Sequence, residues 1–284
     1  MTDWRNWIGR VTTATAFLDP AQANRMAVTL NRPPTMHAGD ALPPAWHWLY
    51  FHDLVQTSDL GTDGHPALGL TMPPLPFDRR MWAGGSLAFE GRLRLGEHVT
   101  RTTTITAITM KRGRTGPLCF VDIEHRFTMN DEPTLLETQS IVYREPPTAA
   151  DAVPAHTTAV DPQFTESWTA DNTTLFRYSA LTFNSHRIHY DSRYATSVEG
   201  YPDLVVQGPL LATLLMDAAA RHGGPLASFD YRARSPVFSS EPFTVNGAQD
   251  GVGLRLWATA GDGRLAMEGT ARVTDSSSTS KSAG

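Results

Sequence analysis

Gly208-Pro209-Leu210-Leu211-Ala212-Thr213-Leu214-Leu215-Met216 opens a segment, residues 209–221, that is apolar on nearly every face. A helix of this kind is buried on all sides, so we expect a sheet to wrap around it. Pro209 is favoured at the first helical position, because the N–H that proline lacks has no helical partner there. Gly223-Gly224 provides the stop. The segment therefore predicts a buried central helix with free N–H groups at its start.

Short β-like runs occupy both halves of the chain. In the first half they cover residues 86–95, 99–110, 117–129 and 135–143. In the second half they cover residues 228–237, 243–248, 253–260 and 264–274. Runs that are joined by short turns rich in Gly, Asn and Asp predict antiparallel meanders. The pattern of strands and buried helices places the fold in the α+β class.

Two weak matches between the halves indicate an internal duplication. Ser86-Leu87-Ala88-Phe89 resembles Ser228-Phe229-Asp230-Tyr231, and residues 116–120 resemble residues 263–267. Residues 146–160 have no hydrophobic periodicity and are predicted to be a linker. We therefore expect an N-terminal domain at 1–150, a C-terminal domain at 160–274 and a disordered Ser- and Thr-rich tail at 275–284.

The composition excludes several classes of protein. The 284 residues are 40% hydrophobic and 19% charged, with a formal net charge of −5 and a pI near 6.0. These values give no general electrostatic reason to bind nucleic acid or an anionic membrane. The single cysteine, Cys119, lies in an apolar run and is expected to be a buried hydrophobic residue. With no apolar leader and no membrane-spanning run, the expected location is cytoplasmic.

The N-terminal half also contains segments with less regular patterns. Asp19 and Pro20 are typical of a helix start, and the helix is expected to reach residue 30. The aromatic run at 45–51 favours either a buried strand or a short helix. Residues 61–76 are rich in Gly and Pro and predict a long irregular loop. Long ordered loops in compact domains tend to be functional.

Phe183-Asn184-Ser185-His186-Arg187-Ile188-His189-Tyr190-Asp191 concentrates polar chemistry in one short segment. Imidazole titrates near working pH, so His189 is a candidate general acid/base. The free N–H of Gly208 could stabilise an oxygen that gains negative charge. A purely structural histidine is the alternative. A metal site at His186, His189 and Asp191 is disfavoured, because no carboxylate-rich segment accompanies them.

These residues resemble the MaoC-like R-specific enoyl-thioester hydratases and dehydratases. The family motif is Asp, any residue, Asn, Pro, any residue, His. When its His is set on His189, Asn184 replaces the Asp, His186 the Asn and Arg187 the Pro. The substituted motif resembles a fused subgroup that includes itaconyl-CoA and mesaconyl-C4-CoA hydratases and type 2 hydroxyacyl-thioester dehydratases. Further segments carry the same resemblance: Gly200-Tyr201-Pro202, Val206-Gln207-Gly208-Pro209, Arg79-Arg80-Met81-Trp82-Ala83-Gly84-Gly85 and residues 111–121.

The resemblance implies a double hot-dog fold, in which two antiparallel sheets each wrap around a central helix. It implies a hydro-lyase acting on an acyl-CoA thioester, with His189 and Asn184 as catalytic residues and Gly208 as a backbone oxyanion donor. An amide is not a base, so either His189 serves both proton transfers, or His186 or Asp191 supplies the second. The first half has no counterpart of this motif. We therefore expect one active site per chain, with the N-terminal half shaping the acyl pocket.

The arginines near the two motif segments bear on the substrate. Arg79, Arg80, Arg187 and Gln207 are expected to bind it, although a solvated pair is the alternative for Arg79 and Arg80. Arg187 would face the carboxylate of a dicarboxylic acyl group. The expected reaction converts itaconyl-CoA or mesaconyl-C4-CoA to citramalyl-CoA without cofactor or metal, coenzyme A being part of the substrate. A dehydratase of fatty-acid elongation and a non-catalytic acyl-thioester-binding subunit are alternatives, and a homodimer remains open.

Overall fold

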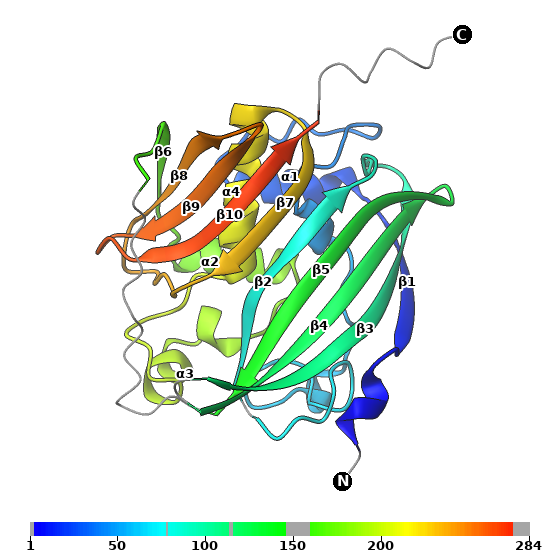
Figure 1. Cartoon of the computed structure of the whole chain (residues 1–284), viewed down its shortest axis with the longest axis vertical. Helices are drawn as coiled ribbons and strands as arrows, with labels where there is room; N and C mark the ends of the chain where they lie inside the picture. Colours follow the sequence, from blue (N-terminus) through cyan, green and yellow to red (C-terminus); the bar gives the residue numbers. More distant parts are fainter. Residues whose placement is uncertain (1–2, 78, 114–115, 146–159, 275–284) are drawn as a thin grey trace.

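The computed structural model describes residues 3–77, 79–113, 116–145 and 160–274. Within them the strands form a ten-stranded antiparallel sheet in the order β1-β3-β4-β5-β2-β7-β10-β9-β8-β6 (Figure 1). The N-terminal strands are β1 (Val11–Phe17), β2 (Arg79–Phe89), β3 (His98–Gly113), β4 (Gly116–Met129) and β5 (Glu132–Arg144). The C-terminal strands are β6 (Phe164–Trp168), β7 (Leu226–Ala233), β8 (Phe243–Asp250), β9 (Gly253–Ala260) and β10 (Leu265–Val273). The predicted α+β class with antiparallel meanders is confirmed.

The strand order repeats between the two halves. It is β1-β3-β4-β5-β2 in the first and β6-β8-β9-β10-β7 in the second, and β2 pairs with β7 to join them. In that pairing Leu87 lies opposite Phe229, so the two matched sequence segments face each other as a duplication predicts. The second match is not equivalent, because residues 116–120 lie in β4 and residues 263–267 lead into β10. The predicted linker and tail fall almost wholly outside the described residues.

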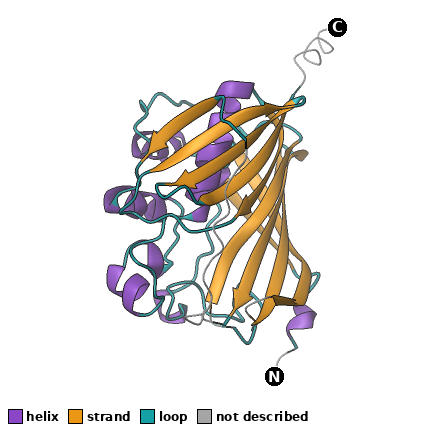
Figure 2. Ribbon diagram, turned by 60° about the vertical axis from the view of Figure 1, so that its left-hand side comes forward, coloured by secondary structure: helices purple, strands orange, loops and turns teal. Residues whose placement is uncertain are grey.

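The helix α4 (Gly208–Gly223) is the central helix of the C-terminal half. It packs against β7, β8, β9 and β10, and ten consecutive residues from Leu210 to Ala219 are buried. Figure 2 shows α4 and the other α-helices gathered on one face of the curved sheet. The predicted buried helix is confirmed, with Gly208 rather than Pro209 as its first residue.

The N-terminal half has a shorter helix. This helix, α1 (Pro20–Thr29), begins after Asp19, whose side chain accepts a hydrogen bond from the Ala21 N–H over 2.9 Å. Its buried side chains belong to the same hydrophobic core as those of α4. The two halves therefore share one main core. The remaining helical segments are η1 (Trp4–Trp7), η2 (Trp46–Leu49), η3 (Thr57–Asp59), α2 (Asn172–Leu181), η4 (Arg187–His189) and α3 (Ser192–Ser197).

The second strand begins earlier than predicted. The first predicted strand starts at residue 86, but Gly84 and Gly85 already lie inside β2, between β5 and β7. A Cβ on Gly84 would lie 2.5 Å from the Tyr231 carbonyl oxygen, and one on Gly85 would lie 2.1 Å from that of Thr138. These glycines allow close contact between strands rather than a turn. As a result, the segment from Arg79 to Trp82 is part of the sheet and reaches the site.

A second hydrophobic cluster covers the far end of β3, β4 and β5. It combines Leu75 and Phe77, at the end of the irregular loop, with strand residues that include Cys119. Cys119 is a free and fully buried thiol, which confirms its predicted role as a core residue. The aromatic run at 45–51 forms the short helix η2, one of the two predicted alternatives. None of the described helices is both long enough and apolar enough to cross a membrane.

Candidate active site

The polar segment 183–191 follows α2 and is held by short-range hydrogen bonds. The Asn184 N–H donates to the Ser179 carbonyl over 2.8 Å, and the Asn184 side-chain oxygen accepts from the His186 N–H over 3.1 Å. The single turn η4 then carries His189 into the interior. Asn184 thus shapes the turn that presents both histidines, and all three residues line one cavity.

The imidazole of His189 is buried and oriented by the backbone. Its Nδ1 lies 2.7 Å from the Val205 carbonyl oxygen. A carbonyl can only accept, so Nδ1 carries the proton and Nε2 has the free lone pair. Burial lowers the pKa of His189 to about 4, although the bond to Val205 acts in the opposite direction. At neutral pH the imidazole is therefore uncharged, with Nε2 available to accept a proton.

The start of α4 lines the same cavity. Gly208 is the first helical residue, and among the described residues its N–H donates no hydrogen bond. A Cβ on Gly208 would lie 2.9 Å from Cε3 of Trp82. Glycine therefore lets the Trp82 ring pack directly against the helix start. The free N–H and the positive end of the helix dipole make this a position for a partially negative oxygen.

Residues of both halves line this cavity, which has a volume of about 480 Å³. Trp48 and Trp82 form part of its wall, with their rings edge to face and the ring centroids 5.7 Å apart. Behind them the buried Glu137 accepts hydrogen bonds from Trp48 Nε1 over 2.8 Å and Gln139 Nε2 over 2.6 Å. Further lining residues are Tyr178, Ile188, Tyr201, Val205, Leu211 and Arg234.

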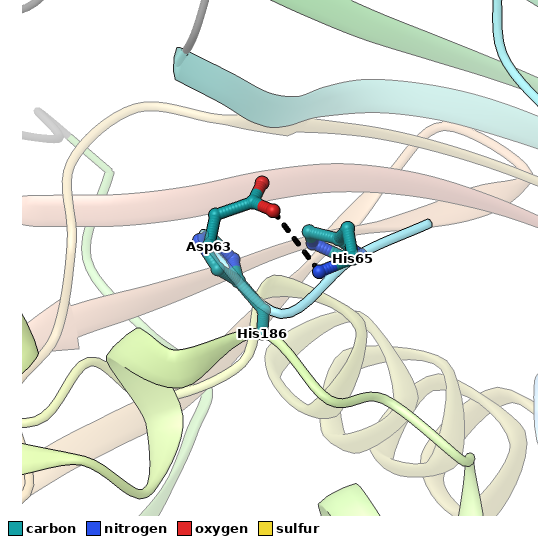
Figure 3. Close-up of side chains that lie close together, drawn as sticks. All are labelled: Asp63, His65 and His186. Atoms are coloured by element: carbon teal, nitrogen blue, oxygen red, sulfur yellow. Dashed lines mark hydrogen bonds between the residues drawn. The ribbon is translucent and has the colours of Figure 1, made fainter. Parts of the chain in front are cut away.

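Three polar residues of the lining, His65, Arg80 and His186, lie close to Asp63, and we call these four residues the polar corner. The His65 and His186 rings are 4.5 Å apart between centroids, and the His186 and His189 rings are 5.3 Å apart. Figure 3 shows Asp63, His65 and His186 drawn together from two loops. His65 was missed in the sequence, although it lies in the irregular loop that was predicted to be functional. Burial lowers the pKa of His186 to about 2, and that of His65 is also far below its usual value for the same reason.

Among the described residues, three members of the polar corner form a group that could hold a cation. The candidate ligand atoms of Asp63, His65 and His186 lie within 4.8 Å of one another. Both oxygens of Asp63 are already engaged, however. One accepts from the His65 N–H over 3.0 Å and the other from Arg80 Nε over 3.1 Å. A metal ion there would have to share its carboxylate with a guanidinium.

The structure separates the predicted substrate-binding arginines. Arg80 lines the cavity, and its Nη2 donates to the Pro66 carbonyl over 3.1 Å. Arg79 does not line it: this side chain is buried and forms an ion pair with Glu199 over 2.8 Å. Arg187 also lies outside the lining. Its Nη2 contacts Asp191 over 2.7 Å, and its Nη1 donates to the Thr62 carbonyl over 3.0 Å.

Two further residues that were predicted to take part in the site, Gln207 and Asp191, do not line the cavity. Gln207 is fully buried, and its Nε2 donates to the Leu175 carbonyl over 2.9 Å and to Ser179 Oγ over 3.0 Å. It fixes the start of α4 against α2 and is not among the lining residues. Asp191 caps α3, accepting from the Tyr194 N–H over 3.0 Å, and is likewise outside the lining. The structure brings together Asn184, His186, His189, Gly208 and Arg80.

The chain is similar to known proteins in both sequence and fold. Residues 45–239 match the model of a family described as hydroxyacyl-thioester dehydratase type 2. The mesaconyl-C(4)-CoA hydratase of Chloroflexus aurantiacus is 41% identical, over 95% of this chain and 98% of that protein. A solved MaoC-like dehydratase from Phytophthora capsici is 16% identical with a TM-score of 0.74, over 96% of this chain and 98% of its own.

A Mycobacterium tuberculosis protein described as having a double hot-dog fold is 12% identical with a TM-score of 0.56, over 94% of this chain and 96% of its own. Its likeness agrees with the duplicated strand order and the buried α4, so the predicted double hot-dog fold is confirmed. The family match covers more than half of the chain, and the hydratase is similar over nearly its whole length. The chain belongs to the family of type 2 hydroxyacyl-thioester dehydratases.

Proposed function

We propose that this protein adds water across the double bond of a short dicarboxylic enoyl-CoA thioester, converting mesaconyl-C4-CoA or itaconyl-CoA to citramalyl-CoA. The observation that carries the proposal is the Nδ1 contact of His189 with the Val205 carbonyl, which leaves Nε2 as a base in a cavity that Gly208 also lines. The similarity to a mesaconyl-C(4)-CoA hydratase supports the choice of acyl group. A cytoplasmic location and a reaction without cofactor are parts of the same proposal.

For a conjugated substrate such as mesaconyl-C4-CoA, the chemistry requires two proton transfers at neighbouring atoms. His189 Nε2 takes a proton from water, and the water oxygen bonds to the β-carbon as the double-bond electrons move toward the thioester oxygen. The Gly208 N–H donates a hydrogen bond to that oxygen while it carries negative charge. Nε2 then gives its proton to the α-carbon, which completes the addition of one water molecule.

The low pKa of His189 fits this double role. An imidazole with a pKa of about 4 is unprotonated before the reaction, and its protonated form is a strong acid that readily returns the proton. The side chain of Asn184 accepts from the His186 N–H. We therefore assign it to orienting the turn and the water rather than to proton transfer.

A 3-hydroxyacyl-thioester dehydratase is the second candidate, favoured by the description of the matching family. It would use the same residues in the opposite direction. The two candidates differ in the acyl group that the cavity accepts and in the direction of the reaction, which is hydration for the first and dehydration for the second. The non-catalytic binding subunit remains the alternative from another class.

The test follows the ultraviolet absorbance of the conjugated thioester with purified protein. We expect loss of absorbance with mesaconyl-C4-CoA, and formation of citramalyl-CoA from itaconyl-CoA by chromatography. We also expect kcat/KM to be higher for these than for crotonyl-CoA. A preference for crotonyl-CoA or for longer linear enoyl-CoAs would favour the second candidate. Tight binding without turnover of any of them would favour the binding subunit.

A further inference from the structure

The polar corner lies next to His189, the base of the proposed reaction. His186 contacts His189 edge to face at 5.3 Å, and His65 lies beyond it at 4.5 Å from His186. Among the described residues, no ring nitrogen of His65 or His186 makes a hydrogen bond. The two rings therefore offer N–H donors that the proposed hydration does not use.

The position of this corner matches one part of the proposed substrate. In mesaconyl-C4-CoA the free carboxylate is bonded to the β-carbon, the same atom that receives the hydroxyl group. A carboxylate on that carbon must lie close to the water that His189 activates. The polar groups adjacent to His189 are therefore at the right place for the carboxylate, whereas the saturated tail of a linear enoyl group would occupy the same space.

The electrostatics of the corner favour an anion. Asp63 holds the Arg80 guanidinium through Nε, and further N–H groups of the guanidinium remain for a ligand. Burial keeps His65 and His186 neutral, and a neutral imidazole has one N–H to donate. Hydrogen bonds from these groups to a carboxylate are charge-assisted and strong. An alkyl tail would instead leave buried donors without partners, which is costly.

A cation is the competing occupant. A cation would bind to the imidazole nitrogens and to Asp63. The Arg80 guanidinium lies 3.1 Å from the Asp63 carboxylate, however, and its positive charge would repel the cation. Arg80 lines the cavity and Asp63 does not, so the charge exposed to a ligand is positive. The arrangement favours an anionic group.

We infer that Arg80, His65 and His186 bind the free carboxylate of the acyl group and so select dicarboxylic over linear enoyl thioesters. This inference rests on the proposed hydration and gives the specificity role to Arg80 in place of Arg187. Arg187 is occupied by Asp191 and the Thr62 carbonyl and lies outside the lining. Arg80 and His65 of this site come from the N-terminal half, whereas His186 and the base His189 come from the C-terminal half.

The test measures the ratio of kcat/KM for mesaconyl-C4-CoA to that for crotonyl-CoA on each protein. The double variant Asp63→Asn/Arg80→Gln removes both charges, so that neither is left buried alone. We expect the ratio to fall at least about 30-fold, or about 2 kcal/mol at about 1.4 kcal/mol per tenfold. His65→Leu should lower the ratio in the same direction. Because both substrates are measured on one preparation, partial loss of folded protein cancels in the ratio.

Arg187→Gln is the matched control, and its ratio should stay within about twofold of wild type, since its side chain contacts Asp191 outside the cavity. An unchanged ratio in the Asp63/Arg80 and His65 variants would overturn the carboxylate site while leaving the proposed hydration intact. Absence of wild-type turnover with either substrate would instead remove the proposed function. Loss of wild-type activity on chelation and its return with Zn²⁺ would show that the corner holds a cation and would also overturn the inference.

Discussion

Replacement of His189 by alanine tests the core of the proposed mechanism. The change removes Nε2, which serves both proton transfers, and the Nδ1–H that contacts the Val205 carbonyl at 2.7 Å. A positioned acid/base group contributes about 10²–10⁴-fold. We therefore expect kcat/KM to fall by at least about two orders of magnitude, or about 2.7 kcal/mol. The orphaned Val205 carbonyl should lower stability by about 1–3 kcal/mol, which leaves the protein folded.

The assay compares initial rates of absorbance loss for wild type, His189→Ala and a control, His98→Ala. His98 is an exposed histidine on β3 whose ring lies tilted against Phe17, so its removal should leave kcat/KM unchanged. The wild-type kcat/KM should also fall on the acid side of the pH profile near pH 4, because His189 must be unprotonated and its pKa is about 4. If His189→Ala keeps more than about a tenth of wild-type kcat/KM, the reasoning from the base is refuted.

The remaining predictions concern the supporting residues. Asn184→Ala should lower kcat/KM less than His189→Ala does, since Asn184 only orients the turn; an equal loss would give it a chemical role. Gly208→Ala places a Cβ 2.9 Å from Trp82 Cε3, so we expect a loss of stability of about 1–3 kcal/mol by thermal unfolding and at least about a tenfold loss of kcat/KM. Unchanged activity would separate the helix start from the chemistry. Burial lowers the pKa of His125 to about 4, so between pH 6.5 and about 4 the unfolded state binds protons that the folded state does not. The neutral, buried His125 costs no stability above about pH 6.5, and its burial should lower the free energy of unfolding by about 2 kcal/mol between pH 6.5 and 5. The free energy of unfolding, measured with urea, should therefore decrease by about 2 kcal/mol less in His125→Gln than in wild type over this pH range. The same pH dependence in both proteins would contradict the prediction.

The parts of the fold that were predictable from the sequence have local causes. A long segment that is apolar on nearly every face indicates a buried helix, and the prediction at 209–221 agrees with α4 (Gly208–Gly223). The start of β2 was not predictable in this way. Gly84 and Gly85 have the appearance of a turn, but they are required by the approach of Tyr231 from β7, a contact that depends on pairing of the two halves.

In the site, too, the residues with a local sequence signal were predictable and those placed by distant contacts were not. His189, Asn184 and Gly208 were found because one motif and one helix start contain them. Arg187 was assigned to the substrate because it is two residues from His189. In the 3-10 turn its side chain instead contacts Asp191 and stacks on the Tyr194 ring, at 4.3 Å from the ring centroid. Proximity in the sequence does not determine the direction of a side chain, whereas His65, remote in the sequence, lies beside His186.

The contact between two loops explains why the remote residue is held so close. Gly64 has a positive φ of 88°, and a Cβ there would lie 2.1 Å from the Ser185 carbonyl oxygen. Its neighbour Asp63 accepts the Arg187 N–H at its carbonyl over 2.9 Å, and Ser185 Oγ donates to the Gly64 carbonyl. The irregular loop of the first half is thereby bound to the turn that carries His189. Because the irregular loop carries both Asp63 and His65, this contact sets His65 beside His186, while β2 brings Arg80 to the same cavity, where its Nε donates to Asp63 over 3.1 Å.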